Sequence, residues 1–170
     1  MAKAREQGTD PLPGERKRRL IAELQERLRA DHAALVRAQQ ATVEGATSAE
    51  AKAEHSKDTR ALEQTYLARG QAQRVEALFE GLSRVAALPV RDFAAGEPIA
   101  VGALVEIEED GAASVLLLVP FGGGIRLAGG EQVVTPASPL GRALIGKTVG
   151  EGGEVVAAGR TRAFEVRAVE

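Results

Sequence analysis

The sequence contains no cysteine, which excludes disulfide bonds and thiolate metal sites. It has no run of about 18 apolar residues, which argues against a membrane span. The segment from Met1 to Arg19 is polar and lacks the apolar stretch of a signal peptide, so we expect a cytoplasmic protein. Aromatic residues are scarce, with four Phe, one Tyr and no Trp, so any core must rely on aliphatic packing.

Glycine and proline are absent between Arg16 and Val43, and apolar residues recur there every three or four positions. This spacing predicts an amphipathic helix that begins at Glu15, after a disordered leader of residues 1–14. The apolar positions are Ile21, Leu24, Leu28, Leu35 and Ala38.

A second helix is predicted after a break at Gly45, Thr47 and Ser48, with the Ser48 hydroxyl as its N-terminal cap. Pro89 ends it, because a residue before proline avoids helical angles. We expect residues 15–88 to form an antiparallel hairpin of the coiled-coil type; a compact helical bundle or a dimeric coiled coil is the alternative. The apolar side of the second helix carries Ala61, Leu62, Leu67, Ala68, Val75, Leu78, Leu82 and Val85.

Charge is unevenly distributed although the net charge is only −2. Residues 15–37 hold seven bases and four acids, whereas residues 44–63 are acidic on balance. Solvated helix faces explain both segments without any ligand. The overall balance gives no reason to expect sequence-specific DNA binding, and a protein partner is more consistent with it.

Beyond a linker at residues 89–98 the pattern becomes that of short strands separated by glycine-rich turns. A single short helix is predicted from Ser138 to Ile145, with Ser138 as its cap and Pro139 at the first helical position. Residues 99–170 are therefore predicted to form a small β-rich domain with one helix, and the whole chain belongs to the α+β class. The strand segments are 103–107, 114–119, 132–135, 155–156 and 164–169.

Enzyme motifs are lacking. The two histidines, His32 and His55, lie in predicted polar helix, and residues 122–124 fit a turn better than a phosphate-binding loop. One acidic set has a spacing of four: Glu50, Glu54 and Asp58 share a helix face. Such carboxylates either form a solvated face or share a hard cation such as Mg²⁺.

The stretch Ser138-Pro139-Leu140-Gly141-Arg142-Ala143-Leu144-Ile145-Gly146-Lys147 resembles the C-terminal domain of the Gre transcript-cleavage factors. Residues 101–107 and 164–169 resemble the same domain, and the preceding hairpin is similar to the coiled coil of that family. The likeness covers residues 15–170. It implies an FKBP-like domain that grips the rim of the secondary channel of RNA polymerase, with a hairpin that enters the channel.

The resemblance also implies functional residues. Glu54 and Asp58, at the hairpin tip, would be the catalytic pair that helps to hold the polymerase Mg²⁺ and its water during transcript cleavage. The protein would be a monomer and not itself an enzyme, with no cofactor of its own and no membrane partner. Residues implied in polymerase docking are Pro120, Phe121, Ser138, Pro139, Leu140 and Arg142.

The tip departs from the family pattern Asp-Leu-Ser-Glu-Asn, because Lys57 stands where the second acid is expected and Asp58 follows it. Two alternatives stay open: an inhibitor that occupies the channel without promoting cleavage, and a coiled-coil adaptor unrelated to transcription. Prolyl isomerase activity is disfavoured, because so few aromatic residues cannot line the usual apolar proline pocket.

Overall fold

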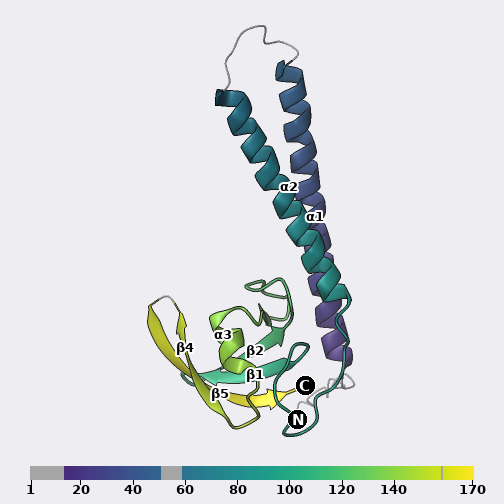
Figure 1. The fold of residues 1–170 in the computed structure, drawn as a ribbon. Coiled ribbons are helices and arrows are strands. Elements are labelled where there is room, and N and C mark those ends of the chain that lie inside the picture. Colours follow the sequence, from purple (N-terminus) through teal and green to yellow (C-terminus); the bar gives the residue numbers. More distant parts are fainter. Residues whose placement is uncertain (1–13, 51–58, 158) are drawn as a thin grey trace, which may run out of the picture.

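Two long helices form a hairpin in the N-terminal half of the chain. The computed structural model describes the backbone of residues 14–50, 59–157 and 159–170, and the side chains of 14–44, 66–156 and 159–170. Helix α1 spans Glu15–Glu50 and helix α2 spans Thr59–Ala86. The two run side by side away from the rest of the molecule (Figure 1), which confirms the predicted hairpin.

The predicted break in the first helix is wrong. Helix α1 continues through Gly45 and Ser48, so Ser48 is not the cap of the second helix. A glycine inside a helix costs only about 1 kcal/mol relative to alanine, and the alanines of this stretch are the best helix formers. Local breaking signals were therefore too weak to interrupt the helix.

The side of α2 that packs against α1, which we call its seam, also differs from the prediction. Leu67 is 63% exposed, whereas Ala68 and Gln71 are half-buried and lead on to Val75 and Leu78 with helical spacing. The Oε1 atom of Gln71 is buried without a hydrogen-bond partner among the described residues. The seam thus includes Gln71, a polar residue outside the predicted apolar set, and lacks Leu67. The side chains at positions 61 and 62 lie outside the described residues.

The C-terminal half forms a five-stranded sheet with strand order β3-β2-β1-β5-β4. All neighbouring strands are antiparallel except β2 and β3, which run parallel. We call residues 99–170 the globular unit. The predicted α+β class is confirmed by its elements: β1 Leu104–Glu109, β2 Ala112–Leu118, β3 Gln132–Val134, α3 Pro139–Leu144, β4 Gly152–Ala157 and β5 Arg160–Val169.

The second half of strand β2 and the residue after it are buried on both faces. Leu116 and Leu118 belong to the cluster that covers α3, whereas Leu117 and Val119 belong to a second cluster shared with the hairpin. Because successive side chains of a strand point to opposite faces, a strand covered on both sides reads as an unbroken apolar run. This explains the continuous run predicted as a strand.

Among the described residues, the hairpin packs on the globular unit only near the end formed by the start of α1 and the end of α2. Leu20, Ile21, Leu24 and Leu28 of α1 and Val85 of α2 pack on the face formed by Leu104, Leu117, Leu127 and Val133. We call residues 15–28 and 81–86 the hairpin base, and residues 29–50 and 59–80 the outer hairpin. In the outer hairpin none of the described side chains is fully buried.

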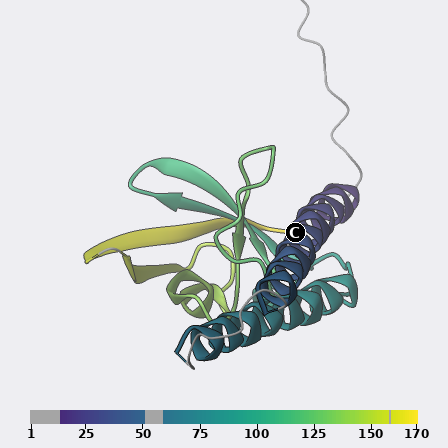
Figure 2. The same cartoon turned by 90° about the horizontal axis from the view of Figure 1, so that it is seen from above.

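The compact bundle considered from the sequence is therefore wrong. Seen from above, both helices lie on one side of the sheet (Figure 2).

Within the described residues, no helix combines the length and the apolar character that crossing a membrane requires.

Candidate functional site

The parallel pairing of β2 and β3 brings two loops together. Leu118 pairs with Val134, and the Val119 N–H donates to the Val134 carbonyl at 2.9 Å. The segments that follow the two strands consequently leave the sheet at the same edge. Gly123 lies against Thr135 so closely that a β-carbon there would be 3.1 Å from the threonine Cγ2.

Helix α3 begins directly at this edge. The Gly141 N–H donates to Ser138 Oγ at 3.0 Å, and Ser138 Oγ donates to the Thr135 carbonyl at 2.8 Å. Pro139 occupies the start of the helix. A β-carbon on Gly141 would lie only 2.0 Å from the Thr135 carbonyl oxygen, so the helix packs directly on the loop. The predicted cap and the predicted proline position are both confirmed.

Two neighbouring hollows follow from this arrangement, and they share Gly123 and Thr135. The first has a volume of about 430 Å³ and the second of about 610 Å³. Five of the six residues predicted to dock on the polymerase line them: Ser138, Pro139 and Leu140 the first, Pro120 and Phe121 the second.

Arg142, the sixth predicted docking residue, lines neither hollow, and its guanidinium donates to the Ala137 carbonyl. The sequence-predicted set is thus largely one surface. Its role in docking stays a prediction.

Both hollows combine apolar walls with a few charged groups. Val134, Leu140 and Val155 line the first, beside the ion pair of Arg162 with Glu109 at 3.2 Å. Among the described residues, no aromatic ring lines it. Apolar walls with few charged groups suit side chains of a protein partner better than a phosphate backbone.

The second hollow lies between the hairpin and the globular unit. Leu28 and Asp31 of α1 and Leu78 and Arg84 of α2 form its helical side. Phe121 reaches it from the loop after β2. This hollow therefore exists only while the two parts of the molecule keep their relative position.

The predicted catalytic and metal-binding pair, Glu54 and Asp58, lies outside the described residues, and so do His55 and Lys57. In the part of the chain that is described, no three His, Asp or Glu side chains gather as a metal ion would require. His32 is half-buried against the ring of Phe79, with ring centroids 5.9 Å apart. The expectation for the tip stays a prediction.

A buried lysine at the hairpin base was missed by the sequence interpretation, which treated the basic run as a solvated face. Lys17 is fully buried, and its ammonium donates to the Arg91 carbonyl and lies 3.9 Å from Asp92 Oδ1. Burial lowers the pKa of Lys17, while Asp92 and then Glu170 oppose that effect. Its spacing of four before Ile21 placed it on the apolar side, which was the available signal.

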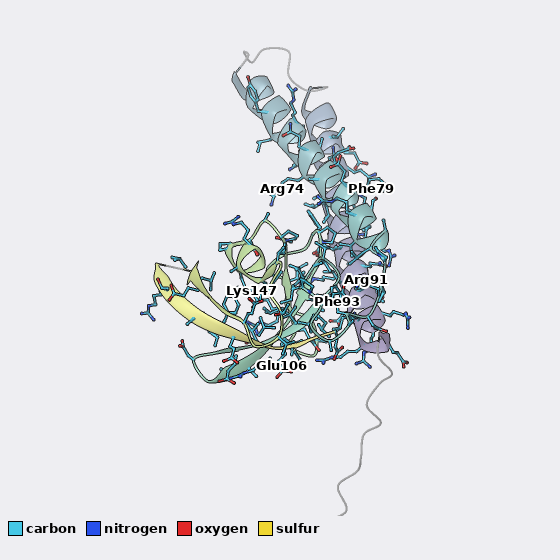
Figure 3. All side chains as sticks on the ribbon, turned by 60° about the horizontal axis from the view of Figure 1, so that its bottom comes forward. Arg74, Phe79, Arg91, Phe93, Glu106 and Lys147 are labelled. Atoms are coloured by element: carbon cyan, nitrogen blue, oxygen red, sulfur yellow. The ribbon has the colours of Figure 1, made fainter. Side chains whose placement is uncertain are left out.

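The ring of Phe93 lies close to two cations where the linker meets the hairpin base, and Figure 3 labels the ring and one of these cations, Arg91. Lys17 Nζ is 5.2 Å from the ring centroid, and the Arg91 guanidinium is 4.0 Å from it. Arg91 also pairs with Glu97 at 2.6 Å. The hydrogen bond from Arg91, and then that from the Ala94 N–H, lowers the pKa of Glu97.

Two further polar contacts fasten α1 to the globular unit. The Ala128 N–H donates to Glu23 Oε1 at 2.6 Å, and Arg16 pairs with Glu131 at 3.3 Å. Glu131 is 8% exposed, and its second carboxylate oxygen is buried without a partner among the described residues. Removing the arginine would leave this carboxylate uncompensated.

These features define a projecting helical hairpin that is fastened at its base to a small α+β unit. Solved structures similar to this chain include the transcription factors called Gfh1. Gfh1 of Thermus aquaticus is 23% identical over 85% of this chain and 92% of that chain, with a TM-score of 0.40. GreA factor homolog 1 (Gfh1) of Thermus thermophilus is 24% identical over 91% and 94%, with a TM-score of 0.39.

A prokaryotic transcription elongation factor GreA/GreB from Nitrosomonas europaea is also similar, at 21% identity over 58% of this chain and 92% of that chain, with a TM-score of 0.36. The chain matches no protein-family model and no curated protein. Likeness at this level of identity concerns the fold.

Proposed function

We propose that this protein regulates transcription elongation by binding RNA polymerase through its globular unit and inserting its hairpin into the secondary channel. The Gre-like segment from Ser138 to Lys147 supports the choice of partner. The hollows beside Ser138 and Pro120 supply a surface with apolar walls on which a protein can dock.

The observation that carries the proposal is the projection of the outer hairpin. Packing on the sheet ends at Leu28, and α1 continues to Glu50. On an ideal α-helix that segment spans about 33 Å. A helix pair of this reach, without buried side chains of its own among the described residues, is suited to enter a narrow passage in a partner.

At the tip, Glu54 and Asp58 would supply carboxylates to the Mg²⁺ of the polymerase and help to position a water for cleavage of a backtracked transcript. Oxygen ligands suit Mg²⁺, which rarely has an all-protein cage and takes one or two carboxylates. In this role the protein is a cofactor of the polymerase and not an enzyme. The Mg²⁺ belongs to the polymerase.

A second function, inhibition by channel occupancy, is favoured by one residue. Lys57 stands beside Asp58, and its ammonium would oppose the approach of a cation. In that case the hairpin blocks the channel and stimulates no cleavage.

Cross-linking from a photoreactive group at position 54 to core polymerase tests docking and tip placement together. We expect a cross-link near the catalytic centre, and loss of polymerase co-purification with Leu140→Asp. Val156→Asp is the matched control, because Val156 is 63% exposed and lines neither hollow. No cross-link and no co-purification would overturn the proposal.

Cleavage of backtracked transcripts separates the two functions. If the protein promotes cleavage, Glu54→Ala and Asp58→Ala reduce the rate, and Glu76→Ala on the exposed side of α2 leaves it unchanged. If the wild-type protein binds but slows elongation without cleavage, the inhibitory function is the correct one.

A further inference from the structure

Helix α2 meets the loop after β2 at a single close approach of glycine to a ring. A β-carbon built on Gly81 would lie 2.3 Å from Cγ of Phe121, 2.4 Å from Cδ1 and 2.5 Å from Cδ2. The part of the Phe121 ring nearest its Cβ atom therefore lies directly against the backbone of α2. Non-bonded carbon atoms prefer about 3.5 to 4.0 Å, so any side chain at position 81 overlaps the ring.

The loop that carries Phe121 has little freedom to yield. Val119 N–H donates to the Val134 carbonyl and Gly124 N–H to the Val133 carbonyl, each at 2.9 Å. Between them, a β-carbon on Gly122 would lie 3.1 Å from Leu24 Cδ1. Both ends of the loop are thus bonded to β3, and its middle touches α1.

Nothing similar occurs elsewhere along the described part of α2. Gly70 lies on the same helix and is exposed, and a β-carbon there would meet no atom within 4 Å. The two helical glycines therefore differ in one property. Gly70 is open to solvent, and Gly81 accommodates the aromatic ring.

We infer that the contact of Gly81 with Phe121 sets the angle between the hairpin and the globular unit. Both are positioning residues for the hairpin. Their consequence for polymerase rests on the proposed function, whereas the angle itself belongs to the free protein. Phe121, expected from the sequence to face a partner, thus also has an internal role.

The geometry amplifies a small change at this point. Gly81 lies at the hairpin base, four residues from the buried Val85, and the described part of α2 extends from it to Thr59. That arm is about 33 Å long on an ideal helix. An overlap of about 1 Å, relieved by tilting the hairpin, moves the outer end of α2 by a few ångströms.

Spin labels can measure the angle directly, because the chain has no cysteine of its own. Labels at Gln40→Cys on α1 and Thr161→Cys on β5 occupy exposed positions in the two parts. Pulsed electron resonance on the free, full-length protein then gives their distance distribution. We expect Gly81→Ala to shift the distribution by a few ångströms and Gly70→Ala to leave it in place.

The double variant separates steric overlap from general damage. In the Phe121→Ala background no ring remains to be displaced, so adding Gly81→Ala should cause no further shift. Phe121→Ala alone should broaden the distribution, and this prediction can be tested even if Gly81→Ala fails to fold. An unchanged distribution in both single variants would overturn the inference.

A binding assay with core polymerase, run beside the distance measurement, distinguishes this inference from the proposed function. If the angle shifts with Gly81→Ala and the wild-type protein does not bind core polymerase, the positioning contact stands and the proposed function fails. If the wild-type protein binds and the angle does not shift, the positioning contact fails alone. When both hold, Gly81→Ala should weaken the cross-link from position 54 while co-purification persists.

Discussion

The hairpin base and the outer hairpin belong to the same two helices but are stabilised differently. The base buries Leu24 and Leu28 against the sheet and adds the polar contacts of Lys17 and Arg16. The outer hairpin has Gln71 in its seam and no fully buried side chain among its described residues. Stability therefore comes from tertiary packing at the base and from helix propensity further out.

The largest expected effect is a core deletion at the base. Leu24 is fully buried, so Leu24→Ala should lower the free energy of unfolding by about 2 to 5 kcal/mol through lost burial and a residual cavity. Urea denaturation measures the loss.

Leu67→Ala is the matched deletion in the outer hairpin, where the side chain is 63% exposed. Surface substitutions of this kind change stability by about 0.5 kcal/mol or less. Equal losses from the two variants would mean that the outer hairpin is packed as tightly as the base, which would break the comparison.

The next effect concerns ion pairs. Arg16→Ala leaves the buried Glu131 carboxylate unpaired and should cost about 1 to 3 kcal/mol. Arg27→Ala removes the exposed pair with Asp31 at 3.8 Å, and should cost about 0.5 kcal/mol or less. Thermal unfolding of both variants at low and high salt tests this, and only the Arg27 pair should be screened appreciably.

The fold could be predicted where local chemistry and tertiary packing agree. The cap of Ser138 and the proline after it each specify a local geometry that the structure retains. The apolar run of β2 was read correctly as a strand, although its cause, cover on both faces, requires knowledge of the hairpin position. Five of the six residues that the family resemblance implied in docking line neighbouring hollows because β2 and β3 end side by side, and their role in docking stays a prediction.

Other features depend on contacts between distant residues. Lys17 is buried because the linker at Arg91 folds over it, and residue type alone indicates a solvated cation. Gly81 and Gly70 look alike in sequence, yet only Gly81 meets a ring from a loop 40 positions later. The break at Gly45 was wrong because a local signal was weighed without its alanine-rich surroundings.

A stabilising change sharpens the comparison within α2. Gly70→Ala removes a flexible residue from an exposed helix interior where a β-carbon meets nothing, and should stabilise the outer hairpin by about 0.5 to 1 kcal/mol. Amide hydrogen exchange of residues 66–77 measures this as slower exchange. Faster exchange would show that this glycine is required by a contact absent from the described residues.

The smallest expected effect is the pH dependence contributed by Lys17. Burial lowers its pKa in the folded protein below the ordinary value of 10.5, so the folded state holds this proton less tightly than the unfolded state does. At pH values below the lowered pKa, folding carries the full free-energy cost of burying the charged Lys17 ammonium. As the pH rises from there towards 10.5, the unfolded chain releases more of this proton, so this cost disappears.

The wild-type protein should consequently gain stability over that interval relative to Lys17→Met, which cannot titrate there. Other titrating groups cancel in the difference between the two proteins. Urea denaturation of both at a series of pH values from 8 to 10.5 measures the gain, with Arg18→Met as the control at an exposed neighbouring position. If the wild-type protein instead loses stability relative to Lys17→Met as the pH rises, Asp92 and Glu170 outweigh burial. The hairpin base would then hold Lys17 as a stabilising cation.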